Sequence, residues 1–367
     1  MRVKLEDVCE RGSSNLKQSD IIEATGDYPI YGASGYIGNV DFYHQDKPYV
    51  AVVKDGAGIG RTTLHPAKSS VIGTMQYLLP KENVLPEYLC YVVRYMHLEK
   101  YFTGATIPHI YFKDYKNEQF NLDSLERQAE IVDILGKCER VIASREDELQ
   151  KLDELIKARF VELFGNPVTN DKGWNTDLCK NLMGKIGSGA TPKGGRESYC
   201  DEGISLIRSM NVYNNRFEYK DLAHITDEQA EQLDNVTIEK SDILLNITGA
   251  SVARCCVVPD ALLPARVNQH VSIIRCKERL LPEFVCSMFT EDSYQRLLWN
   301  IATAGGATRE AITKQQIEDL ILIVPPIALQ KQFMEFVKQI DKSKVAIQKS
   351  LEKMQLLFDS LMQKYFC

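Results

Sequence analysis

Two long stretches of the chain match each other residue by residue, and both have the composition of a long helix. Residues 125–165 and 327–367 contain no proline, and Gly136 is the only glycine before the last residue of either stretch. Shifted by 202 positions, the first stretch aligns with the second without a gap, so that Gln128 meets Gln330. Because proline and glycine interrupt helices, their near absence over about 40 residues predicts two long helices.

Apolar residues recur every seven positions along both stretches. A strict seven-residue repeat predicts that each helix packs along a partner helix in a left-handed supercoil. The simplest partner for each helix is the other, and antiparallel pairing would relate the two halves of the chain by an approximate two-fold axis. The residues expected at this helix-pairing seam are Leu135, Ile142, Leu149, Ile156, Val337, Ile340, Leu351 and Met354.

The internal match continues upstream of both helices. Leu85-Pro-Glu87 aligns with Leu281-Pro-Glu283 at an offset of 196, and Asp55–Arg61 aligns with Thr248–Arg254 at an offset of 193. The order is collinear and the offset only grows along the chain, as expected when loops lengthen in the second copy. The chain is therefore expected to contain two copies of one unit, each a domain followed by a helix.

The two domains are expected to mix strands and helices. The Leu-Pro-Glu segments predict helix starts with proline in the first turn. The Gly-rich segments 31–38 and 187–195 predict loops. Four segments rich in β-branched and apolar residues predict strands: Tyr49–Val53, Met75–Leu79, Asp242–Ile247 and Val271–Ile274.

We therefore expect an α+β protein with two similar mixed α/β domains joined by two long antiparallel coiled-coil helices, with pseudo-two-fold symmetry. The expected boundaries are 1–121 for the first domain, 122–165 for its helix, 166–324 for the second domain and 325–367 for the second helix. The edge of the first domain is the least defined, because Val3–Val8 matches the start of the second, near Leu178–Leu182, only loosely.

Composition and missing motifs exclude several classes of chemistry. There is no Asp/Asn-Pro-Pro-aromatic motif of adenine methyltransferases, no GxxxxGK[ST] loop, and no HExxH or CxxC pair. Gly56-Ala-Gly-Ile-Gly60 lacks the spacing of a dinucleotide fingerprint and predicts a tight turn instead. We expect no catalytic centre, no cofactor and no metal. Without an apolar leader or a membrane-length apolar run, a cytoplasmic chain with ten free thiols is expected.

Several short segments, taken in their order and duplication, resemble the specificity subunits of type I restriction–modification systems over essentially the whole chain. The segments are Leu125-Glu-Arg-Gln128, Ile327-Ala-Leu-Gln330, Tyr28–Gly35, Gly189-Ala-Thr-Pro192, Ser241-Asp-Ile-Leu244 and Val267-Asn-Gln-His270. The resemblance implies two target-recognition domains, each reading one half of a bipartite, asymmetric site in double-stranded DNA. It also implies helices that set the spacing and dock two adenine-N6 methyltransferase subunits, with restriction/translocase subunits in the larger complex and no membrane partner.

Candidate DNA contacts follow from the chemistry of the grooves and the backbone. Arginine matches guanine, asparagine matches adenine, and lysine, arginine and threonine suit phosphates. The net charge of −6 argues against a generally basic binder but allows a local basic face. The candidates are Lys54, Arg61, Thr106, His109, Lys193, Arg208, Asn211, Asn246, Arg254, Thr308 and Arg309. Asn268 and His270 are expected to hold the fold rather than to read sequence.

Two other functions remain open from the residues alone. Asp201, Glu218 and Lys220 have the composition of a Mg²⁺-dependent nuclease site, although the first domain has no equivalent. The chain could also be a coiled-coil scaffold with two heads that do not bind DNA. Divergent heads on matched helices favour DNA recognition, since heads that read different half-sites must differ while the helices need not.

Overall fold

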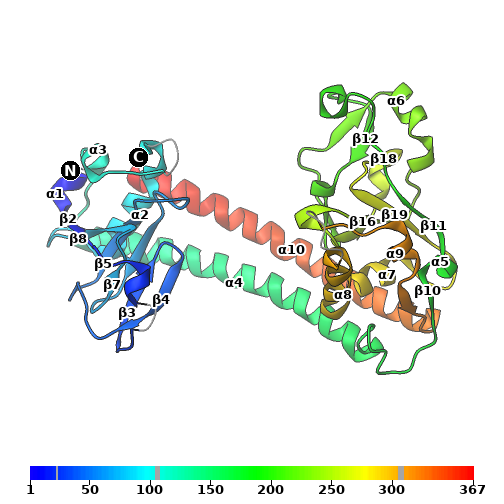
Figure 1. Ribbon diagram of the computed structural model, residues 1–367. Helices are drawn as coiled ribbons and strands as arrows, with labels where there is room; N and C mark the ends of the chain where they lie inside the picture. The colour runs from blue at the N-terminus through cyan, green and yellow to red at the C-terminus, as the bar shows by residue number, and fades with distance from the viewer. Residues whose placement is uncertain (22–23, 104–107, 305–309) are drawn as a thin grey trace. The chain divides into compact units, whose positions relative to one another are not determined.

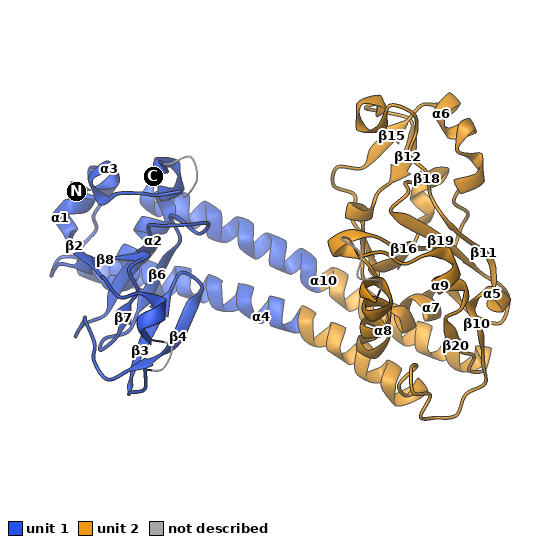
Figure 2. Cartoon of the chain, viewed as in Figure 1, with its two compact units in different colours: residues 1–148, 347–367 blue, residues 149–346 orange. Residues whose placement is uncertain are grey.

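A computed structural model describes residues 1–21, 24–103, 108–304 and 310–367. The chain folds into two compact units, which Figure 2 shows in different colours. Unit 1 comprises Met1–Glu148 and Ile347–Cys367, and unit 2 comprises Leu149–Ala346. The two long helices, α4 (Leu125–Phe164) and α10 (Ile327–Phe366), confirm the helices predicted from the repeat, and each contributes one segment to each unit. The predicted domain boundaries, which keep each helix whole, remain predictions.

The described residues of unit 1 form three small sheets (Figure 1). The largest is antiparallel, in the order β2 (Cys9–Ser13), β8 (Met75–Pro80), β5 (Tyr49–Val53) and β6 (Thr62–His65). The second has the order β4 (Gly35–Val40), β3 (Tyr28–Gly32) and β7 (Ser70–Val71), with β3 and β7 parallel. The third pairs β1 (Arg2–Lys4) with β9 (Gln119–Asn121).

The short helices of unit 1 lie between these strands. They are α1 (Leu5–Val8), η1 (Gln18–Ile21), α2 (Pro86–Tyr95), η2 (Leu98–Tyr101) and α3 (Phe112–Tyr115). Helix α2 begins at the predicted proline, and its buried side chains join β5, β8 and the helix segments in one core. That core includes Leu135 of α4 and Phe366 of α10, so the long helices are part of the unit rather than an appendage.

Unit 2 repeats the three sheets with the same connections. The order β11 (Met183–Ser188), β19 (Val271–Cys276), β16 (Ile243–Asn246), β17 (Cys255–Val257) corresponds to β2-β8-β5-β6. The order β15 (Ala223–Ile225), β12 (Ile204–Ile207), β18 (Ala265–Val267) corresponds to β4-β3-β7, again with one parallel pair. The pair β10 (Thr176–Leu178) and β20 (Ile321–Ile323) corresponds to β1 and β9.

Further elements make unit 2 larger. A hairpin, β13 (Val212–Tyr213) and β14 (Arg216–Phe217), packs beside β17. The helices are α5 (Cys179–Leu182), η3 (Gly195–Ser198), η4 (Ser209–Asn211), α6 (Asp227–Gln232), η5 (Asp234–Val236), η6 (Gly249–Ser251), η7 (Asp260–Leu262), α7 (Pro282–Phe289), α8 (Asp292–Thr303) and α9 (Lys314–Glu318). Lengthened connections of this kind are what the growing offset of the repeat predicts.

The loosely matched start of the first domain is structurally equivalent to that of the second. Leu5 N donates to the carbonyl of Glu118 at 2.9 Å, and Cys179 N donates to the carbonyl of Leu320 at 2.8 Å. In each unit a four-residue helix then leads into the first strand of the large sheet. The sequences diverge because only the backbone pairing and a few buried side chains are required there.

One prediction about a Gly-rich segment is wrong. Residues 31–38 were expected to form a loop, but most of them belong to β3 and β4, with only Ala33 and Ser34 between the paired Gly32 and Gly35. Tyr31, Tyr36 and Ile37 favour strands, and the positive φ of Gly35 (114°) suits a tight hairpin turn. The four predicted strands, by contrast, are confirmed as β5, β8, β16 and β19.

In each unit the segments of α4 and α10 run antiparallel. In unit 1 the Arg127 guanidinium lies 5.7 Å over the Tyr365 ring, while Leu135, further along α4, shares a core with Met362. In unit 2 Phe164 lies 5.6 Å from Phe333, and Asp153, earlier in α4, pairs with Lys344 at 2.6 Å.

The expected seam residues lie along these pairs. Leu135 is buried in the core of unit 1, and Ile156 and Val337 pack against the core of unit 2. The half-buried ones are Ile142, Leu149, Ile340, Leu351 and Met354.

A buried glutamine fastens each long helix to its own unit. The Gln128 carboxamide accepts from Leu85 N at 2.8 Å and donates to the carbonyls of Asn83 and Asp123. Gln330 makes the corresponding bonds, accepting from Leu281 N at 2.9 Å and donating to two carbonyls. Both side chains are completely buried. The residues matched at offset 202 therefore have the same structural role.

All ten cysteines are free thiols. Of the helices in the described ranges, none combines the length and the apolar character needed to cross a membrane.

Candidate nucleic-acid interface

The same backbone turn follows the central strand of each large sheet. In unit 1, Val53 N donates to Arg61 O and Gly60 N donates to Val53 O, both at 2.9 Å. In unit 2, Asn246 N donates to Arg254 O at 2.8 Å and Ala253 N donates to Asn246 O at 2.9 Å. These pairs obey the predicted offset of 193, so the tight turn expected at Gly56–Gly60 is confirmed in both copies.

A later segment of the chain is bonded to each turn. Gly56 N donates to Pro108 O, and Ile110 N donates to Lys54 O, both at 3.0 Å. The matching bonds in unit 2 join Gly249 N to Glu310 O at 3.0 Å and Ile312 N to Ile247 O at 2.8 Å. Thr106, Thr308 and Arg309, predicted to contact DNA, lie outside the described residues.

The turn and the later segment bonded to it form a backbone frame that both units share. Different side chains occupy this frame in the two units. In unit 1 Asp55 hydrogen-bonds the Nδ1 of His109. The equivalent backbone bridge in unit 2 joins Thr248 to Ala311, and the Thr248 hydroxyl instead contacts His270 Nδ1 at 2.6 Å. The frame is thus constant and the groups on it are variable, which is the arrangement needed by two heads that recognise different sequences.

The predicted residues of unit 1 gather at this turn. Arg61 is exposed and donates through Nη1 to Ala33 O at 2.8 Å, which ties the turn to the β3–β4 hairpin. Lys54 is half-buried, with its Nζ 3.7 Å from a carboxylate oxygen of Asp55. His109 stacks on the half-exposed Tyr111 at 6.1 Å.

This surface of unit 1 also carries groups that the sequence did not single out. Lys113 lies 5.3 Å over the Tyr111 ring, and Tyr36, in the hairpin that Arg61 contacts, is 62% exposed. Exposed cations held beside aromatic rings suit the phosphates of the DNA backbone.

Two predicted arginines of unit 2 lie against tyrosine rings. The Arg254 guanidinium carbon is 4.6 Å from the centre of the Tyr213 ring, and that of Arg216 is 4.9 Å from the same ring. Arg208 lies 5.8 Å over Tyr199 and donates to the carbonyl of Asp221. The prediction missed Tyr213 and Arg216, although Tyr213-Asn-Asn-Arg216 has the composition of a hairpin turn.

Lys193 is exposed in a loop that packs against the Val267–His270 segment. Gly189 N donates to Val271 O at 2.9 Å and Ala190 N donates to Val267 O at 3.0 Å. A Cβ on Gly189 would lie 2.1 Å from Val267 O, so only glycine permits this approach. Two of the segments that carried the resemblance therefore meet in space.

Asn211 and Asn246 differ from the other candidates because both are completely buried. The Asn211 amide donates to the carbonyls of Glu218 and Lys220, and the Asn246 amide donates to the carbonyl of Ser209 at 2.8 Å. A side chain enclosed in this way cannot reach a base edge while the loop is folded. We therefore correct the expectation for these two residues and leave them out of the interface proposed below.

Asn268 is also buried, and its side-chain oxygen Oδ1 accepts from His270 N at 3.1 Å, consistent with a role in the fold. Across the described ranges, no group of three or more His, Cys, Asp or Glu side chains is placed to hold a metal ion. The backbone N–H of Lys220 donates to the Glu218 carboxylate at 3.2 Å. This contact belongs to a local turn, so it does not support the nuclease hypothesis.

Comparisons with known proteins agree with this arrangement. A family model described as the type I restriction modification DNA specificity domain matches residues 1–154 and 175–356. A Methanocaldococcus jannaschii protein named as the specificity subunit of the type I restriction enzyme MjaX is 22% identical over 330 residues. The alignment covers 80% of this chain and 73% of that protein.

Two solved structures share the fold. The type I restriction–modification S subunit from M. genitalium aligns with a TM-score of 0.63 at 13% identity, over 100% of this chain and 96% of that one. A chain from a structure concerned with assembly and conformational transition of the type I R-M system aligns with a TM-score of 0.56 at 14% identity, over 100% and 97%. Neither the nuclease nor the scaffold alternative is supported. Since the family model matches most of the chain, in two stretches, the chain belongs to the family of type I restriction–modification DNA specificity subunits.

Proposed function

We propose that each unit reads one half of a bipartite, asymmetric sequence in double-stranded DNA, and that the chain has no catalytic centre of its own. The observation that carries this proposal is the constant turn frame with variable side chains, Asp55 and His109 in one unit against Thr248 and Ala311 in the other. Two equal frames support a common docking geometry, and unequal side chains support unequal half-sites.

The proposed contacts in unit 1 are Lys54, Arg61, Thr106 and His109. In unit 2 they are Lys193, Arg208, Arg254, Thr308 and Arg309. Arginine and lysine supply affinity through phosphates and can read guanine, while histidine can contact either a base or a phosphate. Lys54, Arg61 and Arg254 belong to turns held by backbone hydrogen bonds, so their positions are largely set before DNA binds.

The proposed partners are two adenine-N6 methyltransferase subunits, which would bind the long helices, and restriction/translocase subunits in the larger complex. We place the chain in the cytoplasm, where such a complex meets DNA. The family and the repeat support this assignment, since a duplicated helix offers two similar docking surfaces for two copies of one partner.

The test is to express the chain with its methyltransferase subunits and to sequence adenine methylation in the host genome. A bipartite motif with two unequal halves is expected, and it should disappear when the chain is left out. Methylation without sequence preference would support a scaffold instead. Mg²⁺-dependent cleavage of DNA by the purified chain alone would support the nuclease.

A further inference from the structure

Two arginines and a tyrosine form a compact group on unit 2, which we name the Arg216–Tyr213–Arg254 cluster. Both guanidinium carbons lie within 5 Å of the centre of one ring, at 4.9 Å and 4.6 Å. The ring therefore holds two positive charges near each other, although Tyr213 and Arg216 belong to the hairpin and Arg254 to the turn before β17.

The two charges of the cluster are poorly compensated. The nearest carboxylate of Arg216 is that of Glu218, at 3.9 Å, and the Arg216 side chain is 65% exposed. Arg254 has no acidic side chain within ion-pair distance in the described part of the chain. Like charges repel, so an anion bound beside the two guanidinium groups would stabilise this arrangement. An arginine stacked on a ring keeps its N–H groups free at the edge of the guanidinium, where they can bind that anion.

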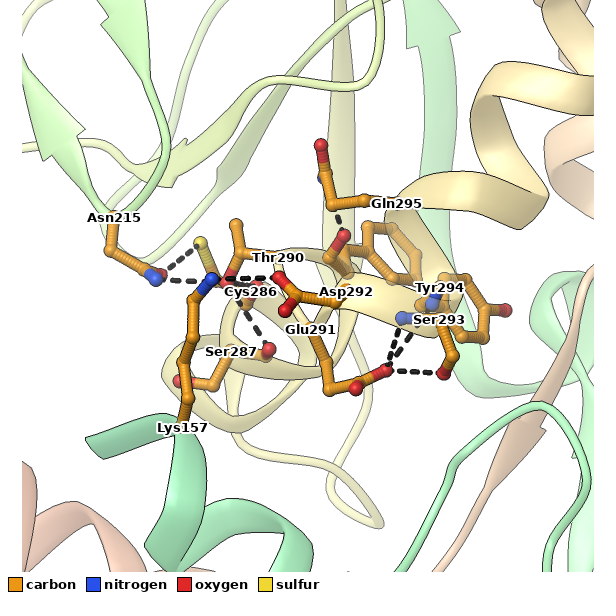
Figure 3. A network of polar contacts seen from close by, with 11 residues as sticks. Lys157, Asn215, Cys286, Ser287, Thr290, Glu291, Asp292, Ser293, Tyr294 and Gln295 are labelled. Carbon is orange, nitrogen blue, oxygen red and sulfur yellow. Dashed lines mark hydrogen bonds and ion pairs between the residues drawn. The ribbon is translucent and has the colours of Figure 1, made fainter. Parts of the chain in front are cut away.

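A polar network around Asn215 holds the hairpin in place (Figure 3). Asn215, in the hairpin turn, has a positive φ of 54°. Its amide donates to the Thr290 hydroxyl at 2.8 Å, and its carbonyl oxygen accepts from the Cys286 thiol at 3.2 Å. Thr290 and Cys286 lie at the end of α7, so this helix anchors the strand pair that carries Tyr213 and Arg216.

A second set of hydrogen bonds, made by Gln295, holds the backbone next to Arg254. The amide of Gln295, which Figure 3 labels, donates to the carbonyl of Ala253 at 2.8 Å and to that of Phe289 at 2.6 Å. Ala253 has a φ of 70°, a conformation that non-glycine residues rarely adopt, whereas the equivalent position in unit 1 is Gly60. Gln295 therefore stabilises a strained residue directly before Arg254.

We propose that the Arg216–Tyr213–Arg254 cluster binds phosphodiester groups of the DNA backbone, with Asn215 and Gln295 as positioning residues. The inference rests on the proposed function and adds the chemical class of the contact. A row of phosphates supplies negative charge to both arginines, whereas a base edge offers hydrogen-bond acceptors without net charge. In unit 1 the equivalent Arg61 is bonded to Ala33 O instead, so the cluster belongs to unit 2 alone.

The test uses the complex of the full chain with its methyltransferase subunits and two short duplexes, one with the methylated sequence and one scrambled. Arg216→Ala and Arg254→Ala should each weaken binding about tenfold or more, by the same factor for both duplexes. Each should also reduce the slope of log affinity against log salt by about 0.9, the value for one phosphate contact. The methylated sequence should not change.

Conservative variants separate positioning from folding. Tyr213→Phe keeps the ring and should bind like wild type, whereas Tyr213→Ala should weaken binding. Asn215→Gly tolerates the positive φ but removes the amide, so it should weaken binding while the melting temperature changes little. Arg279→Ala removes an equal charge from a residue paired with Asp177 and is the control.

Three results would overturn the inference. Arginine variants that bind like Arg279→Ala would show that the cluster does not contact DNA. A loss restricted to one base pair of the recognised sequence would show that an arginine reads a base. A wild-type complex that methylates no defined sequence would contradict the proposed function itself, and the inference with it.

Discussion

Gln128 and Gln330 occupy equivalent positions of the two copies, and their hydrogen bonds explain why both positions hold glutamine. Each carboxamide is completely buried and makes three bonds to backbone groups of its own unit. A buried polar group is costly without partners, so both the glutamine and the backbone groups depend on this contact. The match between them in the sequence is a consequence of that dependence.

We expect Gln128→Ala to destabilise unit 1 and Gln330→Ala to destabilise unit 2, each by about 2–4 kcal/mol, because several backbone groups lose their buried partner. Hydrogen exchange would report this as faster exchange in α2 for the first variant and in α7 for the second. Gln150→Ala, at an exposed position of α4, is the control and should change neither helix. Equal effects of both variants on both helices would contradict the assignment.

His65 gives unit 1 a dependence on pH. The side chain is buried beside Tyr49, and burial lowers the pKa of the imidazole to about 4. The imidazole of His65 therefore binds a proton near pH 6.5 in the unfolded chain but only near pH 4 in the folded unit. The stabilisation is complete above pH 6.5 and is lost as the pH falls through this window, by about 2–3 kcal/mol.

The measurement is chemical denaturation of the chain between pH 7 and pH 4. His65→Gln cannot take up that proton, so its unfolding free energy should fall less steeply over the window than that of wild type, even if it is lower throughout. Parallel pH profiles for the two proteins would show that His65 does not titrate in this way.

At the scale of elements, the long helices leave matched apolar residues uncovered. Leu155 of α4 is 46% exposed, and Leu357 of α10, its equivalent at offset 202, is 47% exposed. Leu356 and Val345 are exposed on α10 as well. Apolar residues at equivalent positions of a repeat suit two copies of one partner, each covering one of them.

Leu155→Asp and Leu357→Asp should each leave the fold intact, because substitutions at half-exposed positions usually cost little stability. Each should remove one of two methyltransferase subunits from the complex, since a carboxylate buried in an apolar contact is strongly unfavourable. The subunit ratio, measured by light scattering, is the readout. Ser360→Asp adds the same charge to α10 and should keep both subunits. Retention of both copies by the leucine variants would place the docking surface elsewhere.

At the scale of the molecule, the two units have separate cores. The core of unit 1 contains residues 3–135 with Met362 and Phe366, and the cores of unit 2 contain residues from 160 to 333. Among the described residues, no buried side chain belongs to the cores of both units, so we expect a change in one head to leave the core of the other intact.

Replacing residues 1–121 by the first head of another family member should therefore change one half of the methylated sequence and leave the other half intact. The graft must keep the contacts to Leu135 and Phe366, which belong to the helices. Genome-wide sequencing of adenine methylation measures both halves at once. A change in both halves would contradict independent recognition.

A second prediction at this scale concerns the spacing of the half-sites. One heptad inserted after Arg145 and another after Ile347 keeps the apolar seam in register and lengthens each helix by about 10 Å. That length corresponds to about 3 base pairs of DNA. Methylation should move to sites with a longer spacer or decline. Undiminished methylation at the original spacing would show that the helices do not set the distance.

The sequence by itself determined the repeat, the two long helices, the central strands and the shared turn. These features depend on local composition and on periodicity, and the offsets of 193, 196 and 202 hold in the hydrogen bonds. Only the tertiary structure decided which polar side chains remain available. Asn211 and Asn246 point into the protein, whereas Arg254 meets a tyrosine from a hairpin about 40 positions earlier. Such contacts join residues that are far apart in the sequence, so the residues next to them in the chain do not indicate which partners they have.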